Sequence, residues 1–371
     1  MQKMTSAELR RKNISSIYNF IYRSGGATRQ EIQQQLQLSL PTIAQDLRFL
    51  EQEGLVRMSG LSDSRGGRRP QALECDATAR YAIGVELLKD TVDLVAIDLF
   101  GKRLASRSLR VPYENSRVYQ CMLSANVRQL VLELALPPER LLGVGIAVQG
   151  LVSDDGSRIV YGKVLQNTGT TLNDFAQELS VPAMLIHDAE AAAFAEIWRR
   201  SDLKDAIYLG LNRNIGGAVV LDRRILHGDN LRSGAIEHMC LVPNGPQCYC
   251  GRKGCMETYC SGERLELASG CSLEAFFDRL RGGDASMRRI WEEYLQHLAF
   301  SIDSIRFVLD QTILLGGCIA EQMLPEDMEY IRSHVQEAEM CELRLEKGTV
   351  STYPAATGAA LQYIDRFLSS I

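Results

Sequence analysis

Apolar residues recur every three or four positions over three successive stretches at the start of the chain, which is the spacing of an amphipathic helix. In residues 7–26 the inward face is predicted to hold Leu9, Ile14, Ile17, Tyr18 and Ile21. A second helix should begin after Thr28, a predicted N-cap with Glu31 at the capping-box position. A third helix is predicted over residues 40–54, with Ile43, Leu47 and Leu50 facing inward.

Residues 54–76 have the pattern of two short strands around a polar, arginine-rich tip. A helix, a helix-turn-helix and a hairpin in this order predict a winged helix-turn-helix domain, assigned to residues 1–75. The third helix would lie in the major groove of double-stranded operator DNA, and its outward residues are predicted to be Ser39, Thr42, Gln45, Asp46 and Arg48. Arginines beside glycines and a proline suit a narrow minor groove, and the tip offers Arg65, Arg68 and Arg69. The alternative is a solvated hairpin on a protein-interaction module.

Charge is unevenly distributed along the 371 residues. Residues 1–75 hold 11 of the 41 Lys and Arg residues but 7 of the 46 Asp and Glu residues, which leaves 30 basic and 39 acidic side chains for the rest of the chain. A basic segment on an acidic body is typical of a protein that contacts nucleic acid through that segment alone, although chance would also give so small an excess.

From residue 81 onward the pattern changes to apolar β-type runs. Two of them form a predicted hairpin over residues 81–102, and a helix over 118–136 and a buried strand over 141–150 follow. Residues 206–228 repeat the strand-turn-strand theme, before a late helix, a strand over 311–317 and a closing helix. The repeat predicts a duplicated α/β domain over residues 76–371, with two lobes and a ligand cleft between them.

Cysteines cluster in the stretch "CYCGRKGC", and a histidine precedes it. His238, Cys248, Cys250 and Cys255 have the spacing H-x9-C-x-C-x4-C, a Cys3His set that suits one tetrahedral, structural zinc ion per chain. The cluster contains no C-x-x-C, which disfavours redox chemistry. Buried cysteines without a metal are the alternative, and two further cysteines nearby compete as ligands, Cys240 and Cys260.

The sequence has no secretory h-region at its start and no apolar run long enough to cross a bilayer. A cytoplasmic location without membrane contact is therefore expected. Because thiols stay reduced there, the ten cysteines favour metal binding or burial over disulfides.

The motif "CYCGRKGCMET", with a histidine at this distance before it, resembles the signature of the ROK family. That family joins repressors, open reading frames of unassigned role and sugar kinases. The resemblance covers essentially the whole chain and is to the repressor branch, of the xylose and N-acetylglucosamine type, which carries a winged helix. It implies an actin-like, hexokinase-type fold and a carbohydrate effector.

The first phosphate loop of the family's kinases, D-x-G-G-T, is altered here. Glu86 stands for the aspartate, Leu88 and Lys89 for the glycines, and Asp90 for the threonine. These side chains fill the space that phosphate oxygens need, and Asp90 would repel them. The second loop, at 211–220, keeps only two glycines of its pattern, so productive ATP binding and catalysis are not expected.

The sugar-binding motifs that the resemblance implies depart less from the family. Asp188 stands at the position of the kinase base, with His187 and Glu190 in place of two asparagines. Without a phosphoryl donor, Asp188 would only accept hydrogen bonds from sugar hydroxyls, and it would also suit a helix N-cap.

Three further residues complete the expected sugar site. Glu237 lies in a rearranged motif, Glu257 matches a sugar-contacting glutamate of the family, and His238 would bind zinc through one ring nitrogen and the sugar through the other. The expected sugar-binding residues are thus His187, Asp188, Glu237, His238 and Glu257.

These observations predict a zinc-containing transcriptional regulator, a repressor that responds to a sugar. Reading a symmetric operator requires two winged helices, so a homodimer or a dimer of dimers is expected. Two alternatives stay open: an active ATP-dependent sugar kinase with a DNA-binding appendage, and a ligand-free regulator controlled by a protein partner.

Overall fold

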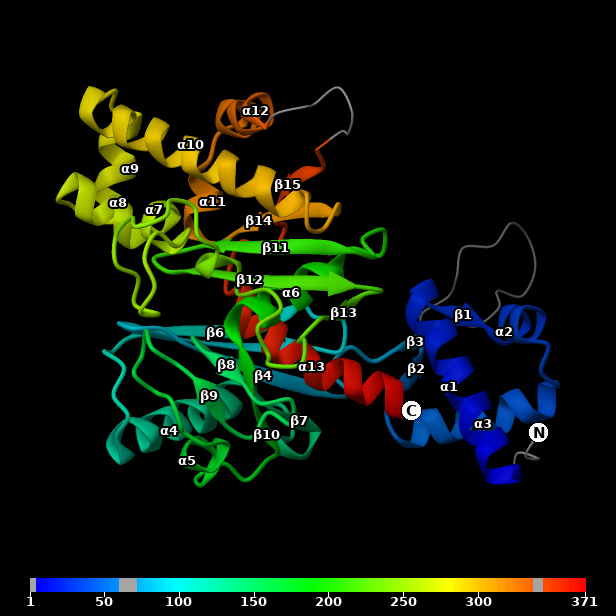
Figure 1. The fold of residues 1–371 in the computed structure, drawn as a ribbon. Coiled ribbons are helices and arrows are strands. Elements are labelled where there is room, and N and C mark those ends of the chain that lie inside the picture. Colours follow the sequence, from blue (N-terminus) through cyan, green and yellow to red (C-terminus); the bar gives the residue numbers. More distant parts are fainter. Residues whose placement is uncertain (1–4, 60–71, 336–342) are drawn as a thin grey trace.

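The computed structural model describes residues 5–59, 72–335 and 343–371. Its N-terminal part is a three-helix unit with a small antiparallel sheet of order β1-β3-β2 (Figure 1). The elements are α1 (Ser6–Ser24), β1 (Ala27–Thr28), α2 (Arg29–Leu36), α3 (Leu40–Gln52), β2 (Val56–Met58) and β3 (Ala72–Cys75). This is the predicted winged helix-turn-helix.

The capping signals in the sequence account for where α2 and α3 begin. The Thr28 hydroxyl accepts from the Glu31 N–H at 3.2 Å, and the Glu31 carboxylate accepts from the Thr28 N–H at 2.7 Å, so the predicted capping box is present. Ser39 caps α3 in the same way, because its hydroxyl accepts from the Thr42 N–H at 3.3 Å. The predicted inward residues of α3, Ile43, Leu47 and Leu50, are buried.

Two residues of this unit do not face the way the sequence predicts. Leu9 is 53% exposed, because it lies near the start of α1 and outside its packed face. Asp46, expected on the outward face of α3, is only 2% exposed, since it faces α1, where Arg10 Nε lies 3.6 Å from its carboxylate. The predicted wing-tip residues Arg65, Arg68 and Arg69 fall outside the described residues.

The rest of the chain is built on two five-stranded sheets with the same plan. Their orders are β10-β7-β4-β5-β6 and β15-β14-β11-β12-β13, and in each the first three strands are parallel and the last three antiparallel. The repeated topology confirms the predicted duplicated, two-lobed α/β architecture (Figure 1).

The first lobe is covered on its outer face by α4 and α5. Its elements are β4 (Tyr81–Leu87), β5 (Thr91–Asp98), β6 (Arg103–Arg110), α4 (Arg117–Leu134), η1 (Pro138–Arg140), β7 (Leu141–Val148), β8 (Leu151–Val152), β9 (Ile159–Tyr161), α5 (Leu172–Ala176) and β10 (Ala183–His187). Strand β4 is buried along its whole length, as a strand covered on both faces should be.

The second lobe has a sheet covered by a group of helices. Its elements are β11 (Ala206–Leu211), β12 (Ile215–Leu221), β13 (Arg224–Ile225), η2 (Ile236–His238), α7 (Glu257–Cys260), α8 (Gly262–Ser269), α9 (Leu273–Arg281), α10 (Ala285–Arg306), β14 (Thr312–Gly316), α11 (Cys318–Gln322), α12 (Pro325–His334) and β15 (Leu345–Lys347).

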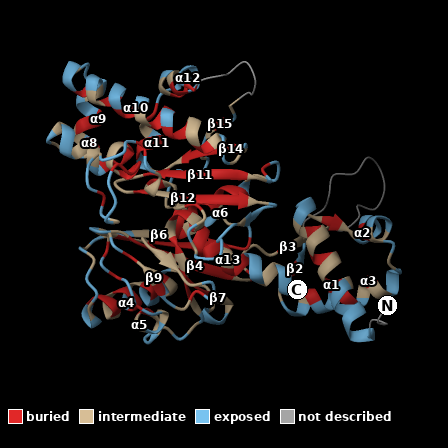
Figure 2. Ribbon diagram, in the orientation of Figure 1, coloured by how far each residue is buried: buried red, intermediate tan, exposed pale blue. Residues whose placement is uncertain are grey.

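Two helices lie between the sheets and join the lobes: α6 (Asp188–Arg199), which follows β10, and α13 (Pro354–Ser370), which follows β15 (Figure 1). They approach closely because small residues face each other; a Cβ on Gly358 would collide with the Ala191 backbone. Both helices bury their apolar faces (Figure 2). Because α6 begins at Asp188, its N-terminus brings two of the predicted sugar-binding residues, His187 and Asp188, to the cavity.

The winged helix-turn-helix packs against the first lobe and shares one apolar cluster with it. The Tyr22 ring stacks on Phe100 with a centroid distance of 4.5 Å, and its hydroxyl donates to the Leu99 carbonyl at 2.7 Å. Arg80 lies over the Phe367 ring of α13, 5.5 Å from its centroid.

No helix of the described ranges is both long and apolar enough to cross a membrane.

Candidate functional site

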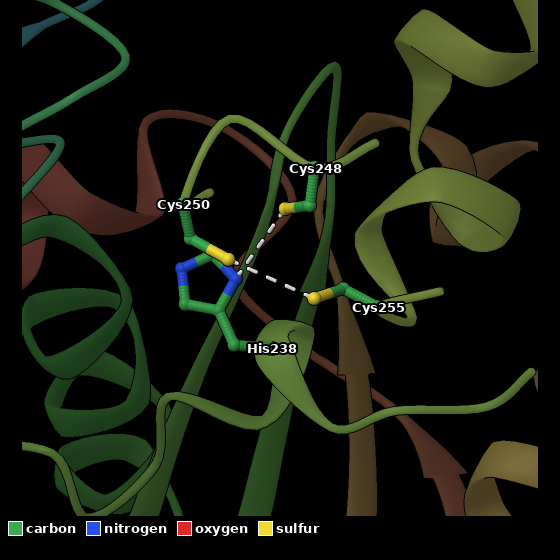
Figure 3. A group of neighbouring side chains, drawn as sticks. All are labelled: His238, Cys248, Cys250 and Cys255. Carbon is green, nitrogen blue, oxygen red and sulfur yellow. Dashed lines mark hydrogen bonds between the residues drawn. The ribbon is translucent and has the colours of Figure 1, made fainter. Parts of the chain in front are cut away.

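Four potential metal ligands converge beside the cleft. His238 ends η2, and the loop that follows returns with Cys248, Cys250 and Cys255 around it (Figure 3). The loop turns tightly because Gly254 has a φ of 74° and packs against the Val242 carbonyl, where a side chain would not fit.

The geometry of these four residues fits a tetrahedral ion. Their ligand atoms all lie within 4.8 Å of one another, and both the Cys250–Cys255 Sγ pair and the pair of Cys248 Sγ and His238 Nδ1 are 3.7 Å apart. Ligands about 2.3 Å from a tetrahedral ion are about 3.8 Å apart, which matches. The cluster can therefore hold a metal ion.

The two competing cysteines lie elsewhere. The Cys240 thiol is exposed and contacts the Lys253 carbonyl at 3.7 Å, whereas Cys260 is buried against the Ser301 hydroxyl at 3.9 Å. Neither belongs to the group of converging ligands in the described part of the chain.

His238 connects this centre to the cleft. Its Nδ1 faces the Cys248 sulfur, while its Nε2 lies 3.6 Å from the Glu237 carboxylate on the cleft side. Burial, together with the nearby guanidinium groups of Arg252 and Arg232, lowers the pKa of His238 to about 4. The imidazole is therefore neutral at pH 7, as metal coordination requires.

Beside the centre lies a cavity of about 500 Å³ between the lobes. Four of the five predicted sugar-binding residues line it: His187, Asp188, Glu237 and His238. The turn after β7 contributes Gln149, and the end of β9 contributes Tyr161. Lys163 follows β9, and Asn214 lies in the turn between β11 and β12. The loops around the metal centre add Arg232, Tyr249 and Arg252.

The buried end of the cavity is rich in carboxyl and amide oxygens. Among the described residues, Gln149 Oε1 and Glu237 Oε2 are buried without a hydrogen-bond partner. Burial raises the pKa of Asp188, and it raises the pKa of Glu237 to about 8. Because buried polar atoms normally have partners, these oxygens are positioned for groups of a bound ligand.

Asp188 is the first residue of α6, so the N-cap position falls to His187. The Asp188 carboxylate nevertheless accepts from the Ala189 N–H at 2.9 Å, and His187 Nε2 lies 3.2 Å from the same oxygen. These contacts hold the carboxylate at the cavity wall.

Glu257 does not line the cavity, although the sequence places it among the sugar-binding residues. Its two oxygens accept from Asn214 Nδ2 at 2.8 Å and from the Ile215 N–H at 2.9 Å. It therefore holds the turn between β11 and β12, whose Asn214 does line the cavity.

The outward face of α3 keeps three exposed or half-buried polar side chains of the predicted set, namely Thr42, Gln45 and Arg48. Ser39 is exposed as well, but its hydroxyl caps the helix and lies 2.8 Å from that of Thr42. Asp46 faces the interior and cannot reach DNA.

Sequence reasoning missed the cationic and aromatic residues of the cavity, Tyr161, Lys163, Arg232, Tyr249 and Arg252. Tyr249 and Arg252 had a signal, because they lie between the predicted metal ligands. The others come from loops without a recognisable pattern, and only the fold brings them together.

These features define a class of protein: a winged helix-turn-helix joined to a duplicated α/β domain, with a cysteine–histidine cluster that can hold a metal ion beside an interlobe cavity. Residues 82–365 match the family model of the ROK family, and residues 10–57 match that of winged helix-turn-helix DNA-binding domains. The chain belongs to the ROK family.

Curated relatives of similar length include regulators. The DNA-binding transcriptional dual regulator NagC of Escherichia coli K12 is 26% identical over 328 residues, which cover 83% of this chain and 81% of the relative. The xylose repressor of Bacillus spizizenii is 27% identical over 248 residues, or 66% of this chain and 64% of the relative.

Solved structures share the fold. A ROK family transcriptional regulator, described as a homologue of the E. coli MLC protein, covers 97% of this chain and 98% of its own, with a TM-score of 0.76 and 20% identity. A ROK family glucokinase from Streptomyces griseus, in complex with glucose and AMPPNP, covers 76% of this chain and 98% of its own, with a TM-score of 0.68 and 18% identity.

Proposed function

We propose that the protein is a sequence-specific DNA-binding transcriptional repressor of carbohydrate metabolism, controlled by a sugar in the interlobe cavity. One observation carries the proposal: a helix-turn-helix with an open recognition face is packed against a lobe whose cavity holds carboxyl and amide oxygens without a hydrogen-bond partner. The regulators among the relatives, an N-acetylglucosamine repressor and a xylose repressor, support it.

For DNA, the N-terminal half of α3 enters the major groove. Thr42 and Gln45 contact base edges, while Ser39 and Arg48 contact the backbone. Arg65, Arg68 and Arg69 of the wing extend into the minor groove. The protein acts in the cytoplasm as a homodimer or a dimer of dimers, so that two recognition helices read a symmetric operator.

For the ligand, Asp188, Glu237 and His187 bind sugar hydroxyls, and Glu257 contributes by holding the turn that carries Asn214. One structural zinc ion is bound by His238, Cys248, Cys250 and Cys255. When bound, the ion fixes the loop that forms one cavity wall and orients His238, whose Nε2 then contacts the ligand.

The protein is not a sugar kinase. Supporting this, the Arg213 guanidinium lies 3.0 Å from the Asp90 carboxylate and bridges the two turns where phosphate loops would be needed. Glu86 is buried near Asp188, and burial together with that carboxylate raises its pKa to about 8.

The test is a DNA-binding assay with purified protein and the promoter regions adjoining its own gene, repeated across a carbohydrate panel. Specific DNA binding that at least one carbohydrate weakens is expected. Sequence-independent binding would contradict a regulator, and DNA release that needs a protein partner while no carbohydrate binds would contradict control by a sugar.

A further inference from the structure

A second pocket, of about 450 Å³, opens where the turn between β5 and β6 meets α6 and the segment that leads into α13. The residues that line it are all different from those of the interlobe cavity. The cavity lies at Asp188, where α6 begins, and the second pocket lies at Trp198, about 15 Å further along that helix. Pockets for small ligands typically enclose about 300–1,000 Å³, so this one is large enough for a ligand.

Three exposed cationic side chains surround this pocket: Lys102 and Arg103 at the start of β6, and Arg199 in the last turn of α6. None of them forms an ion pair with an acidic side chain of the described residues, whereas the neighbouring Arg200 pairs with two carboxylates. The described residues that line the pocket include no acidic side chain. The positive charge at this opening is therefore not neutralised locally and favours an anion.

Two buried carboxylates beside the pocket hold its walls and leave the cations unpaired. Asp98 accepts from the backbone N–H groups of Phe100 and Lys102, both at 2.9 Å, and so fixes the turn between β5 and β6. Glu196 accepts from the N–H groups of Thr349 and Val350, both at 2.8 Å, and so fixes the segment before α13. The walls are thus held by hydrogen bonds within the protein.

The floor of the pocket is apolar, in contrast to its rim. It is formed by four buried side chains: Ile97, Ala195, Val350 and Leu361. Trp198 Nε1 and the Thr357 hydroxyl, both on half-buried side chains of the lining, have no hydrogen-bond partner among the described residues. An apolar floor with a few polar groups is typical of a site for a small organic molecule.

We infer that this pocket is a second ligand site, which binds a small organic anion. The phosphate or carboxylate group of the ligand contacts Arg103, Arg199 and Lys102, and its carbon skeleton covers the apolar floor. Because Phe100 lines the pocket and stacks on Tyr22 of α1, the ligand binds at the junction of the first lobe and the winged helix-turn-helix. The inference does not depend on control by a sugar, since it concerns a pocket outside the interlobe cavity.

The experiment is calorimetric titration of the full chain with four probes: phenyl phosphate, benzoate, neutral benzyl alcohol and inorganic phosphate. At least one aromatic anion should bind about tenfold tighter or more than benzyl alcohol, and its affinity should fall with salt. Tighter phenyl phosphate identifies a phosphate ester as the ligand class, and tighter benzoate identifies a carboxylate. Inorganic phosphate should bind more weakly than the aromatic anion, because it cannot cover the apolar floor.

Tryptophan fluorescence locates the bound probe. The chain has two tryptophans, and Trp291 is buried in the core of the second lobe, so a change on binding should come from Trp198. The change should therefore disappear in Trp198→Phe.

Variants identify the groups that bind the anion. Arg103→Gln with Arg199→Gln should weaken the anion by about tenfold or more and leave benzyl alcohol unchanged. Both arginines are exposed, so the double variant should fold, which thermal unfolding checks. Arg232→Gln, at the interlobe cavity, is the matched control and should bind the anion as the wild type does.

Three results would overturn the inference: no binding of either anion to the folded protein, equal affinity for the anions and benzyl alcohol, or unchanged anion affinity in the double variant. Weaker binding in Arg232→Gln would overturn it as well, because it would place the anion in the interlobe cavity. The proposed function is tested separately, with DNA and carbohydrates, and survives any of these results.

Discussion

Arg213 in the turn between β11 and β12 forms an ion pair with Asp90 in the turn between β4 and β5, at 3.0 Å, and so connects the two lobes at the mouth of the cleft. A second carboxylate, that of Glu266, lies 3.1 Å from Arg213 Nε. The first turn has Leu88 and Lys89 where the kinase pattern has glycines, the second loop keeps only Gly216 and Gly217 of its pattern, and a charged pair connects the two turns. The pair is therefore one reason to expect that the altered loops do not bind ATP.

The first prediction is that the protein does not phosphorylate sugars, even though Asp188 lies at the cavity wall. A general base contributes about two to four orders of magnitude, but phosphoryl transfer depends mainly on positioning the phosphates and their metal. A coupled assay with ATP, magnesium and a panel of hexoses, amino sugars and pentoses should show no turnover. Turnover that disappears in Asp188→Asn would establish a kinase; otherwise that variant should change only the affinity for the sugar.

The second prediction is one zinc ion per chain. Cys248→Ser should abolish stoichiometric zinc in elemental analysis and weaken sugar binding as well, because His238 contacts both the metal centre and the cavity. Cys240→Ser is the control, since the Cys240 thiol is exposed and outside the cluster, and it should keep zinc and binding unchanged. A metal-free protein that is folded and still binds its sugar would refute the assignment.

The convergence of His238, Cys248, Cys250 and Cys255 was predictable because all four lie within a short stretch of the chain and have a spacing typical of metal ligands. The winged helix was predictable for a similar reason, since local capping and periodicity determine α2 and α3. The orientation of Asp46 was not, because its burial depends on Arg10 of another helix. The periodicity of α3 alone does not predict an ion pair with a residue of α1.

The lining of the cavity could likewise be predicted only in part from the sequence. Its acidic residues belong to motifs that the sequence displays, whereas Lys163 and Arg232 lie in loops that only the meeting of two lobes brings together. Glu257 is recognisable as part of the site, but its role depends on a hydrogen bond to Asn214 that no sequence pattern encodes.

The third prediction concerns DNA binding. Arg68→Ala with Arg69→Ala should weaken operator binding and lower the slope of log K against log salt by about 0.9 for each phosphate that the variant no longer neutralises. Arg48→Ala should do the same from the exposed face of α3. Salt titrations by fluorescence anisotropy measure the slope, with Arg288→Ala as a distant control. An unchanged slope would make the wing arginines ordinary solvated residues.

The fourth prediction is a pH-dependent contact between His227, which follows β13, and Glu190 of α6. His227 Nδ1 lies 3.2 Å from the Glu190 carboxylate of α6, and this contact, with a smaller contribution from Asp154, raises the pKa of His227 above its ordinary value of 6.5. A raised histidine pKa means that the stabilisation is present at low pH and is lost as the pH rises through the folded-state pKa.

The measurement is an NMR titration of His227 together with thermal unfolding of wild type and Glu190→Gln. His227 should titrate above pH 6.5 in the wild type and close to it in Glu190→Gln. The stability advantage of the wild type over the variant should be present at pH 6 and diminish toward pH 8.5, by about 1 kcal/mol or less since His227 is half exposed. A pKa at or below the ordinary value in the wild type would contradict the contact.

The last prediction concerns how the sugar controls DNA binding, and it follows from the turn between β5 and β6. Phe100 of this turn stacks on Tyr22 of α1, and Leu99 accepts the hydrogen bond of the Tyr22 hydroxyl at 2.7 Å. On its other side, Gly101 packs against Trp198 of α6, the helix that begins at Asp188 in the cavity wall. The turn therefore touches both α6, which begins at the cavity wall, and α1 of the winged helix-turn-helix.

Tyr22→Ala should reduce the effect of the sugar on DNA affinity, because it removes this contact, while DNA affinity without sugar stays near the wild-type value. Coupling between two sites is typically worth about 1–3 kcal/mol, which corresponds to a 5- to 150-fold change in DNA affinity when the sugar is added. In Tyr22→Ala most of this change should disappear. Tyr22→Phe is the matched control: it removes only the hydrogen bond, about 0.5–1.5 kcal/mol of stability, and keeps the stacked ring. DNA titrations with and without saturating sugar measure the coupling for each variant. Full coupling in Tyr22→Ala would show that the signal passes through another contact, such as Arg80 with Phe367 of α13.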